Sequence, residues 1–373
     1  MNSLGEARPR VLLIGDSLAL GGTEGQFVET ACGLKNAGWD VHVACLRAEG
    51  PLRAMLDAVG LAPRSCGPGS FRSPRALLAV LRLARYLTRH RIRLVHAFDF
   101  YSNLLGVPAA RLARVPVIIA SQRDLGDLRP PLQHRLHRAI LRLADLVVVN
   151  TPVIAERLTR DGTVASDRLV VIQNGVDLER FSADAPARRR PSPTIGTLAN
   201  LRPEKGLSDL VQAVALVRAR HPRHRTLIWG EGPLRGELER QIHELRLGDT
   251  VELRGTTTQP ELALRELDIF VLPSVSEACS NALLQAMATG RAVVATRVGG
   301  NTALVADGMT GLLVPPRDSA ALAAAIGRLI DEPELAATLA ARARRRVRSE
   351  FGVDQMLARV QSLYERTLAG VAA

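Results

Sequence analysis

The sequence predicts an α/β protein with two Rossmann-like domains, each built on a parallel sheet. Short apolar runs alternate with helical stretches along most of the 373 residues, a pattern that gives parallel strands joined by helical crossovers. The runs are continuously apolar, which is typical of strands covered on both faces. The pattern stops near residue 182 and resumes at residue 194, so we expect two sheets in tandem. Ligands of such sheets bind beyond the carboxyl ends of the strands, and two facing sheets would form a cleft there.

The first half of the chain contains six predicted strands, beginning with the run RVLLIGD. They cover residues 10–16, 41–47, 93–98, 115–121, 145–150 and 168–174. Helices are predicted at 24–37 and 72–91 and between most of the remaining strands. Strands alternating with helical segments in this way indicate βαβ units.

The second half repeats this order. Strands are predicted at residues 194–200, 225–230, 250–255, 268–274 and 292–298. Helices are predicted at 206–220, 234–246, 260–267, 280–289, 319–330, 334–348 and 354–368. We found no close sequence repeat between the halves, so their similarity is architectural.

The segment 182–193 separates the two sets because it has three prolines, three successive arginines and no periodic apolar face. We interpret it as an interdomain linker, with a long surface loop inside one domain as the alternative. The predicted domains are residues 1–182 and residues 183–352, followed by a last helix at about 353–373.

The charge of the chain indicates an anionic partner. Its formal net charge is +12; residues 1–190 hold 27 Lys and Arg against 17 Asp and Glu, and residues 191–373 hold 22 against 20. Phosphate-bearing substrates and anionic lipid both fit this excess in the first half. Nucleic acid is disfavoured, because aromatic residues make up 3% of the chain and stacking platforms are scarce.

The cysteines and the termini favour a cytoplasmic protein. Cys32, Cys45, Cys66 and Cys279 lack CxxC spacing and a nearby His cluster, so we expect reduced thiols and neither disulfides nor a zinc site. The first ten residues lack an apolar signal core, and no run reaches the ~20 apolar residues that span a bilayer.

The segment 72–91 has leucines at helical spacing and several arginines. Such a helix can rest on anionic lipid, which would place the protein peripherally at the inner face of the membrane. A domain helix with a solvated basic face is the alternative reading. The basic residues of the segment include Arg75, Arg82, Arg85, Arg89 and Arg91.

Two loops of the second half carry candidate phosphate ligands. Arg202 and Lys205 lie three residues apart at a helix entrance, where they can clamp phosphates and stabilise a leaving diphosphate; a solvated basic pair is the alternative. Glu277 follows a strand, and a helix begins near Ser280 and Asn281, whose free amides can hold phosphate or hydroxyl groups. The alternative for Glu277 is a capping carboxylate near a helix start.

The first half carries weaker candidates. Gly21 and Gly22 lie between the opening strand and a helix, where backbone amides can approach a diphosphate; a simple tight turn is equally consistent. His96 ends a predicted strand with Asp99 close by, either as a functional or as a structural histidine. No DxD triplet, GxSxG elbow or GxxxxGK[ST] loop occurs, so no carboxylate pair for a metal-bound diphosphate is evident.

At this point the sequence resembles glycosyltransferase family 4, the retaining glycosyltransferases of the GT-B fold. The resemblance covers nearly the whole chain in the family's order and spacing. It implies that residues 1–182 form an acceptor-side domain, that residues 183–352 bind the nucleotide sugar, and that the last helix, about 353–373, returns to the first domain. It is carried by IQNGVDLERF (172–181), LRPEKG (201–206), WGEGPLRGELE (229–239), VELRG (251–255), FVLPSVSEACSNALLQAMATGRAVVATRVGG (270–300) and DGMTGLLVPPRD (307–318).

The resemblance implies roles for named residues in the second half. Arg202 and Lys205 look like the pair that holds the donor diphosphate. Glu277 looks like the first glutamate of an E-x7-E motif that contacts the donor sugar. The amides around Ser280, Asn281 and Ala282 would hold sugar hydroxyls and phosphate.

Three positions of the first half are implicated in the same way. Gly21 and Gly22 lie in the loop that touches the donor diphosphate. His96 matches the position that reaches the donor sugar. Arg123 lies where the family has an acceptor-side or sugar-side residue.

Two positions depart from the family pattern. The second glutamate, which usually binds the nucleotide ribose, is Gln285 here, and the glutamate expected three residues after Gly300 is Ala303. An uncharged amide still bonds a hydroxyl, and we expect a loss of about 1–2 kcal/mol of binding. Both changes put ribose affinity and full activity in question.

The resemblance implies a metal-independent transfer with retention of configuration, from a nucleotide-diphosphate sugar as co-substrate and without a cofactor. The acceptor would be a glycan, a lipid-linked molecule or a small molecule. Two alternatives stay open: a UDP-sugar epimerase of the same fold, and a non-catalytic protein that binds sugar nucleotides or lies at the membrane.

Overall fold

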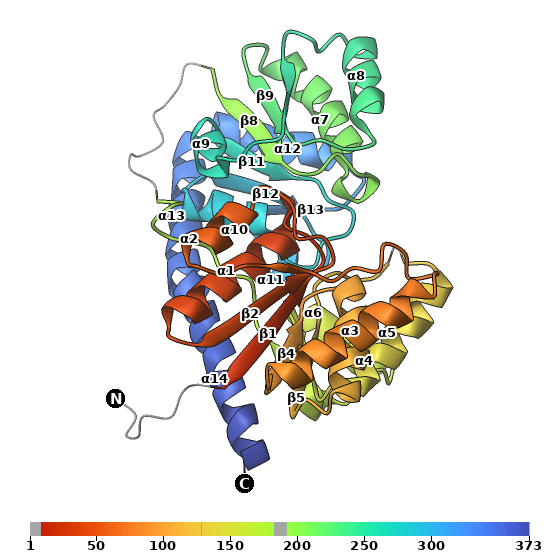
Figure 1. Cartoon of the computed structure of the whole chain (residues 1–373). Coiled ribbons are helices and arrows are strands. Elements are labelled where there is room, and N and C mark those ends of the chain that lie inside the picture. Colours follow the sequence, from red (N-terminus) through yellow and green to blue (C-terminus); the bar gives the residue numbers. More distant parts are fainter. Residues whose placement is uncertain (1–8, 128, 183–191, 373) are drawn as a thin grey trace. The chain divides into compact units, whose positions relative to one another are not determined.

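The computed structural model of the chain describes residues 9–127, 129–182 and 192–372 (Figure 1). The chain divides into two compact units, Met1–Asn174 with Asp354–Ala373, and Gly175–Val353. Most of the predicted linker, residues 183–191, lies outside the described residues.

The first unit contains a parallel sheet in the order β3-β2-β1-β4-β5-β6-β7, formed by its described residues. The strands are β1 (Arg10–Gly15), β2 (Asp40–Cys45), β3 (Arg64–Ser65), β4 (Leu94–Ala97), β5 (Val117–Gln122), β6 (Leu146–Val149) and β7 (Leu169–Val171). In the register of the central pair, Leu13 of β1 lies beside His96 of β4. The order reverses between β1 and β4, which is the crevice where parallel sheets usually bind ligands.

Helices cover this sheet on both faces, so its central strands are buried, while the edge strands β3 and β7 are partly or fully exposed. They are α1 (Gly22–Asn36), α2 (Arg53–Ala58), α3 (Arg75–Arg89), α4 (Phe100–Leu112), α5 (Pro131–Leu143), α6 (Pro152–Arg160), the short 3₁₀ turn η1 (Ser166–Arg168) and α14 (Val353–Ala372). Helices α3, α4 and α5 pack in sequence as neighbours (Figure 1). The last helix, α14, packs beside α1, with Leu357 against Gly33, and Trp39 Nε1, just after α1, donates to Gln361 Oε1 at 3.4 Å.

The second unit contains a parallel sheet in the order β10-β9-β8-β11-β12-β13, again within the described residues. Its strands are β8 (Thr194–Leu198), β9 (Arg225–Trp229), β10 (Val251–Gly255), β11 (Ile269–Leu272), β12 (Ala292–Thr296) and β13 (Leu312–Val314). Its helices are η2 (Pro203–Lys205, a 3₁₀ turn), α7 (Leu207–Arg220), α8 (Arg235–Glu244), α9 (Pro260–Arg265), α10 (Asn281–Ala288), α11 (Asn301–Leu304), α12 (Ser319–Asp331) and α13 (Pro333–Glu350).

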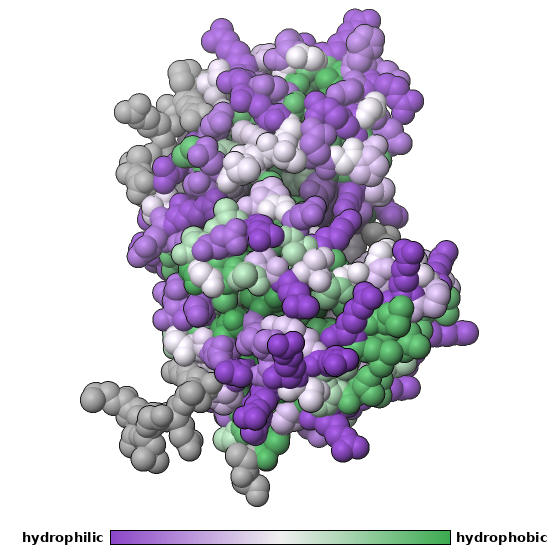
Figure 2. Space-filling view, viewed as in Figure 1, coloured by the Kyte–Doolittle hydropathy of each residue, from purple (hydrophilic) through white to green (hydrophobic). Residues whose placement is uncertain are grey.

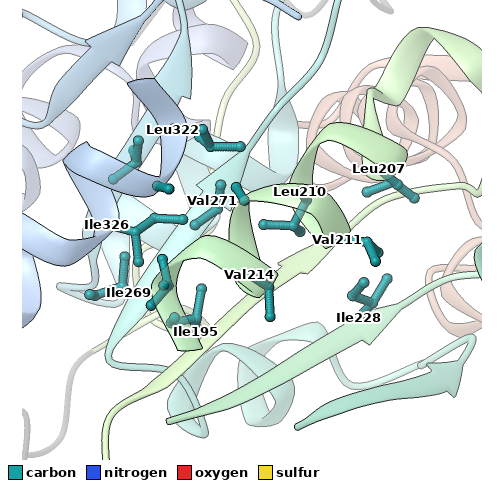
Figure 3. Packing of buried hydrophobic residues seen from close by; sticks show 14 of the residues in the cluster. Ile195, Leu207, Leu210, Val211, Val214, Ile228, Ile269, Val271, Leu322 and Ile326 are labelled. Atoms are coloured by element: carbon teal, nitrogen blue, oxygen red, sulfur yellow. The ribbon is translucent and has the colours of Figure 1, made fainter. Parts of the chain in front are cut away.

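The core of the second unit explains why its strands read as continuous apolar runs. Successive residues of a strand point to opposite faces, and both faces are covered. On one face, Ile269 and Val271 of β11 pack against α7 and α12, as Figure 3 shows. On the other face, Phe270 and Leu272 of the same strand pack with residues of α9, α10 and α13.

The predicted α/β class with two parallel sheets is confirmed. Two strands escaped prediction because they are short: β3 has two residues, and β13 has three in the run LLV. All four cysteines are free thiols, and burial raises the pKa of Cys45 and of Cys66 to about 12. Within the described part of the chain, no helix combines the length and apolar character that crossing a bilayer requires.

Candidate functional site

The loops that follow β8, β11 and β12 are joined to one another at the carboxyl edge of the second sheet. Val275 N donates to Glu204 O at 2.8 Å, which joins the loop after β11 to the η2 turn. Gly300 N donates to Glu277 O at 2.9 Å, which adds the loop after β12. Three segments far apart in the sequence thus form one backbone framework, in the place where parallel sheets bind ligands.

Two glycines permit this close approach. Gly206 has φ of +61°, and a Cβ there would overlap the carbonyl oxygen of Pro273. At Gly300 a Cβ would overlap the carbonyl oxygen of Ala278. A larger residue at either position would push apart the loops that carry the candidate residues.

Lys205 and Glu277 meet within this framework. Lys205 Nζ lies 2.7 Å from Glu277 Oε2, and the side chains are 22% and 11% exposed. Ser274 Oγ donates to the same carboxylate oxygen at 3.2 Å. The Glu277 carboxylate is therefore held by two donors, and it in turn fixes the Lys205 ammonium at the sheet edge.

Arg202 and the start of α10 complete the set. The Arg202 side chain is exposed, and within the described residues it has no ion pair or side-chain hydrogen bond. Ser280 caps α10, its hydroxyl accepting from Leu283 N at 3.2 Å. Asn281 and Ala282 open the helix and are partly exposed, as is Gln285 one turn on. The positive end of a helix and two cationic side chains on loops of one sheet edge carry the kind of charge that suits a doubly charged anion such as a diphosphate.

The loop at Gly21 and Gly22 is acidic in this structure. Gly21 precedes α1 in an extended conformation, and Glu24 of the first turn accepts from Ser17 Oγ at 3.2 Å. Burial raises the pKa of the nearby Asp16 carboxyl, and the charge of Glu24 raises it further. A diphosphate approaching these amides would meet carboxylates, so contact of Gly21 and Gly22 with the donor stays a prediction.

His96 lies in the core of the first unit. The residue is 1% exposed, with Nδ1 2.6 Å from Tyr364 Oη of α14 and Nε2 2.7 Å from Ser121 Oγ. Burial, with the charge of Arg123, lowers the pKa of the ring well below its usual value. Both ring nitrogens are hydrogen-bonded inside the first unit, and contact of His96 with the donor sugar stays a prediction.

The Arg123 side chain is also buried. Its Nη1 donates to Asn174 Oδ1 at 3.0 Å, and its guanidinium lies 4.8 Å from the centre of the Phe98 ring. Phe98 in turn lies against the His96 ring, with their centres 4.4 Å apart. Arg123 therefore belongs to the same buried polar group as His96, and its predicted contact with acceptor or sugar is not tested by this arrangement.

The pKa of the Asp99 carboxyl, which precedes α4, is raised to about 7. Burial is the main cause, and the charges of Asp16 and Asp124 add to it. The folded protein thus keeps a proton on Asp99 that the unfolded chain releases near pH 4. The stability that this proton contributes is complete below about pH 4 and is lost as the pH rises to about 7.

Asp99→Asn should weaken that pH dependence. Asparagine keeps the oxygen that accepts from Phe100 N at 2.7 Å but cannot ionise. We expect the variant to gain about 4 kcal/mol over wild type between pH 4 and pH 8, since each unit of pKa difference corresponds to about 1.4 kcal/mol. Urea unfolding followed by Trp39 fluorescence, in a Trp229→Phe background, reports on the first unit alone. The exposed Asp167→Asn is the matched control, and equal pH profiles for all three proteins would refute the assignment.

Two residues that the sequence analysis did not single out support the candidate site residues. Ser274 holds Glu277, and its only sequence signal is its position directly after a strand. Tyr364 holds His96 across 268 residues of chain, a separation that no local pattern reveals. The described residues contain no group of three or more His, Cys, Asp or Glu side chains placed to hold a metal ion.

Comparison with known proteins identifies the family. Residues 20–180 match the family described as Glycosyltransferase Family 4, and residues 192–332 match Glycosyl transferases group 1. A D-inositol 3-phosphate glycosyltransferase of Streptomyces scabiei is 34% identical over 300 residues, which cover 73% of this chain and 67% of the relative. A glycogen synthase of Mycobacterium tuberculosis is 30% identical over 288 residues, covering 73% and 69%.

Solved structures agree on the fold. HepE of Anabaena in complex with UDP-glucose matches with a TM-score of 0.84 and 22% identity, over 96% of this chain and 99% of that one. A sucrose-phosphate synthase of Thermosynechococcus elongatus matches with a TM-score of 0.83 and 23% identity, over 97% and 100%. The chain belongs to glycosyltransferase family 4 and is a retaining hexosyltransferase of the GT-B fold that takes its sugar from a nucleotide sugar.

Proposed function

We propose that the donor is a UDP-hexose, that its diphosphate binds at Arg202 and Lys205, and that transfer needs no metal ion. The observation that carries this is the Lys205–Glu277 pair, held at the sheet edge beside the free Arg202 side chain and the start of α10. The choice of uridine rests on the UDP and UDP-glucose complexes of HepE.

The residues divide the work by charge. Arg202, Lys205 and the first amides of α10, at Ser280 to Ala282, supply positive charge for the diphosphate in place of a metal ion. Glu277 accepts from hydroxyls of the donor sugar. As the glycosidic bond lengthens, negative charge grows on the departing phosphate, and the same cations stabilise it. That phosphate then takes the proton of the acceptor hydroxyl, so that no separate general base is needed.

Ligand binding and transfer test this proposal together. UDP-glucose at 100 times its dissociation constant should stabilise the protein by about 2.7 kcal/mol, and GDP- and ADP-sugars at the same concentration much less. Product analysis with and without acceptor separates transfer from epimerisation of the donor. Transfer should continue in EDTA; its loss there, with recovery on adding Mg²⁺ or Mn²⁺, would refute the metal-free chemistry.

Gln285→Glu should strengthen donor binding. Gln285 is partly exposed on α10, one turn after the helix start, in the place where the family pattern has a ribose-binding glutamate. A charged acceptor for the ribose hydroxyls should lower the dissociation constant of UDP by about 5–30-fold, corresponding to about 1–2 kcal/mol. Calorimetric titration with UDP measures this. Weaker or unchanged binding would place the ribose elsewhere.

The acceptor is proposed from charge alone. The excess of arginine in the first half favours an acceptor that carries phosphate, either small or lipid-linked. The name of the Streptomyces scabiei relative, D-inositol 3-phosphate glycosyltransferase, points the same way. We propose that the protein works in the cytoplasm, at or near the inner face of the membrane.

A further inference from the structure

A cavity of about 490 Å³ lies between β3 and the first half of α3, at the carboxyl edge of the first sheet. Its floor is the segment after β3, which continues the sheet because Cys66 N donates to Cys45 O at 2.9 Å and Gly67 N to Leu46 O at 3.1 Å. Its lining includes three arginines, Arg64, Arg75 and Arg82.

These arginines have no carboxylate partner within the described residues. Arg64 is held in place by Tyr86, whose ring centre lies 4.8 Å from the guanidinium carbon. Residues 58–98 contain eight arginines and neither Asp nor Glu, so no acidic side chain of this stretch neutralises the cavity. Three exposed guanidinium groups around one cavity repel one another unless an anion lies between them.

The same helix turns leucines toward solvent. Leu77, Leu78 and Leu81 are 66%, 50% and 46% exposed, which is high for residues of a helix that also packs on a sheet. Leu78 also lines the cavity, so the arginines and the leucines adjoin. Figure 2 shows an apolar patch fringed by hydrophilic side chains over the region of α3 and α5. On α5, Leu132 and Leu136 are 66% and 45% exposed.

We propose that this surface of the first unit docks on an anionic lipid bilayer, with Arg64, Arg75 and Arg82 around a lipid phosphate and Leu77 and Leu81 in the acyl boundary. A cationic helix face beside an apolar one is the chemistry that an anionic bilayer interface selects. A second copy of the chain fits poorly, because its own face would bring the same positive charge.

This inference deepens the proposed function by naming the acceptor-side surface, and it rests on that function only for its biological use. Docking is measured without donor, and UDP binding is measured without lipid. A protein that binds UDP but no vesicles would overturn the docking surface alone. A protein that binds vesicles but no nucleotide would overturn the donor site alone.

The test is co-sedimentation of the full chain with phosphatidylglycerol vesicles at low and high salt. We expect binding at 0.05 M salt and much weaker binding at 0.5 M, because salt screens the attraction between the arginines and the lipid phosphates. Each arginine near an anionic surface contributes about 1 kcal/mol to the free energy of binding. The same constant predicts about 100-fold weaker binding for Arg64→Gln/Arg75→Gln/Arg82→Gln. The matched control changes three exposed arginines of the second unit, Arg223, Arg240 and Arg345, to glutamine and should bind like wild type.

The apolar half of the surface has its own variants. Leu77→Gln/Leu81→Gln should weaken vesicle binding by about 10-fold or more, because the two glutamines bury no apolar surface in the acyl region of the bilayer. Leu216→Gln/Leu262→Gln, at exposed leucines of the second unit, is the control. Circular dichroism confirms that each variant is folded.

Three results would overturn the proposal. The first is absence of binding to phosphatidylglycerol vesicles at low salt. The second is equal loss in the arginine variant and its control, which would leave only non-specific attraction. The third is full release of the wild-type protein from vesicles by millimolar glycerol 3-phosphate, which would make the cavity a site for a soluble phosphate.

Discussion

Replacing Lys205 with alanine should lower the turnover number by about 100- to 1000-fold, the loss usually seen when one preorganised group that stabilises developing charge is removed. Lys205 is held by Glu277 at 2.7 Å and is only 22% exposed, so its ammonium is already in place before a donor binds. The charge that it neutralises grows as the diphosphate departs, and the turnover number should therefore fall more than the donor affinity does.

The chain supplies its own control for this experiment. Its two lysines are Lys205 and Lys35, and Lys35 lies exposed in the last turn of α1. Lys35→Ala removes the same charge from the first unit and should leave steady-state kinetics unchanged. Arginine at position 205 would restore charge but not the compact ammonium, so partial recovery is expected. Wild-type turnover in Lys205→Ala would end the assignment of this residue.

The second large effect is expected for Gly206→Ala. The new Cβ would overlap the carbonyl oxygen of Pro273, and alanine at φ of +61° adds backbone strain. Together these should cost the second unit about 2 kcal/mol or more. Because the η2 turn must move away from the loop after β11, the bond from Val275 N to Glu204 O and the Lys205–Glu277 pair should both weaken. Donor binding should therefore fall by about 10-fold or more.

Trp229, in the core of the second unit, reports its unfolding when Trp39 is replaced by phenylalanine. In that background Gly206→Ala should unfold at lower urea concentration than its parent, and calorimetry should show weaker UDP binding. Gly236→Ala is the matched control: it lies in α8 with no atom within 4 Å of the new Cβ, and should stabilise by about 0.5–1 kcal/mol. Equal stability of the two variants would show that the loops do not depend on Gly206.

The pattern of apolar runs was enough to predict both sheets because strands buried on two faces carry their signal locally. The loops of the second unit that carry Arg202, Lys205 and Glu277 could also be singled out, since these residues lie in short, specific segments. Their joining by backbone bonds could not be predicted, because the close approach of Gly206 to Pro273 links residues 67 positions apart. A glycine at a helix entrance looks the same in the sequence whether it is needed for approach or not.

In the first unit, the surroundings of the candidate residue His96 could not be predicted. Its family position implies a contact with the donor sugar, and the structure shows its ring hydrogen-bonded to Ser121 and to Tyr364. Whether a histidine at a strand end faces a ligand or the core depends on which helix covers it, and that helix comes from the far end of the chain. The arginine-lined cavity was foreseen only as a basic amphipathic helix, because Arg64 joins it from β3 through tertiary packing.

The hydrogen bond between Tyr364 and His96 implies that the first unit completes its folding late in synthesis. When the ribosome has made residues 9–174, the first sheet is complete in sequence, but its buried histidine and Trp39 still lack their partners on α14. Those partners follow only after the whole second unit, roughly 10–40 s later at usual elongation rates. The first unit is therefore the first to be synthesised and the last to be completed. During that interval the nascent chain exposes the part of its core that α14 later covers.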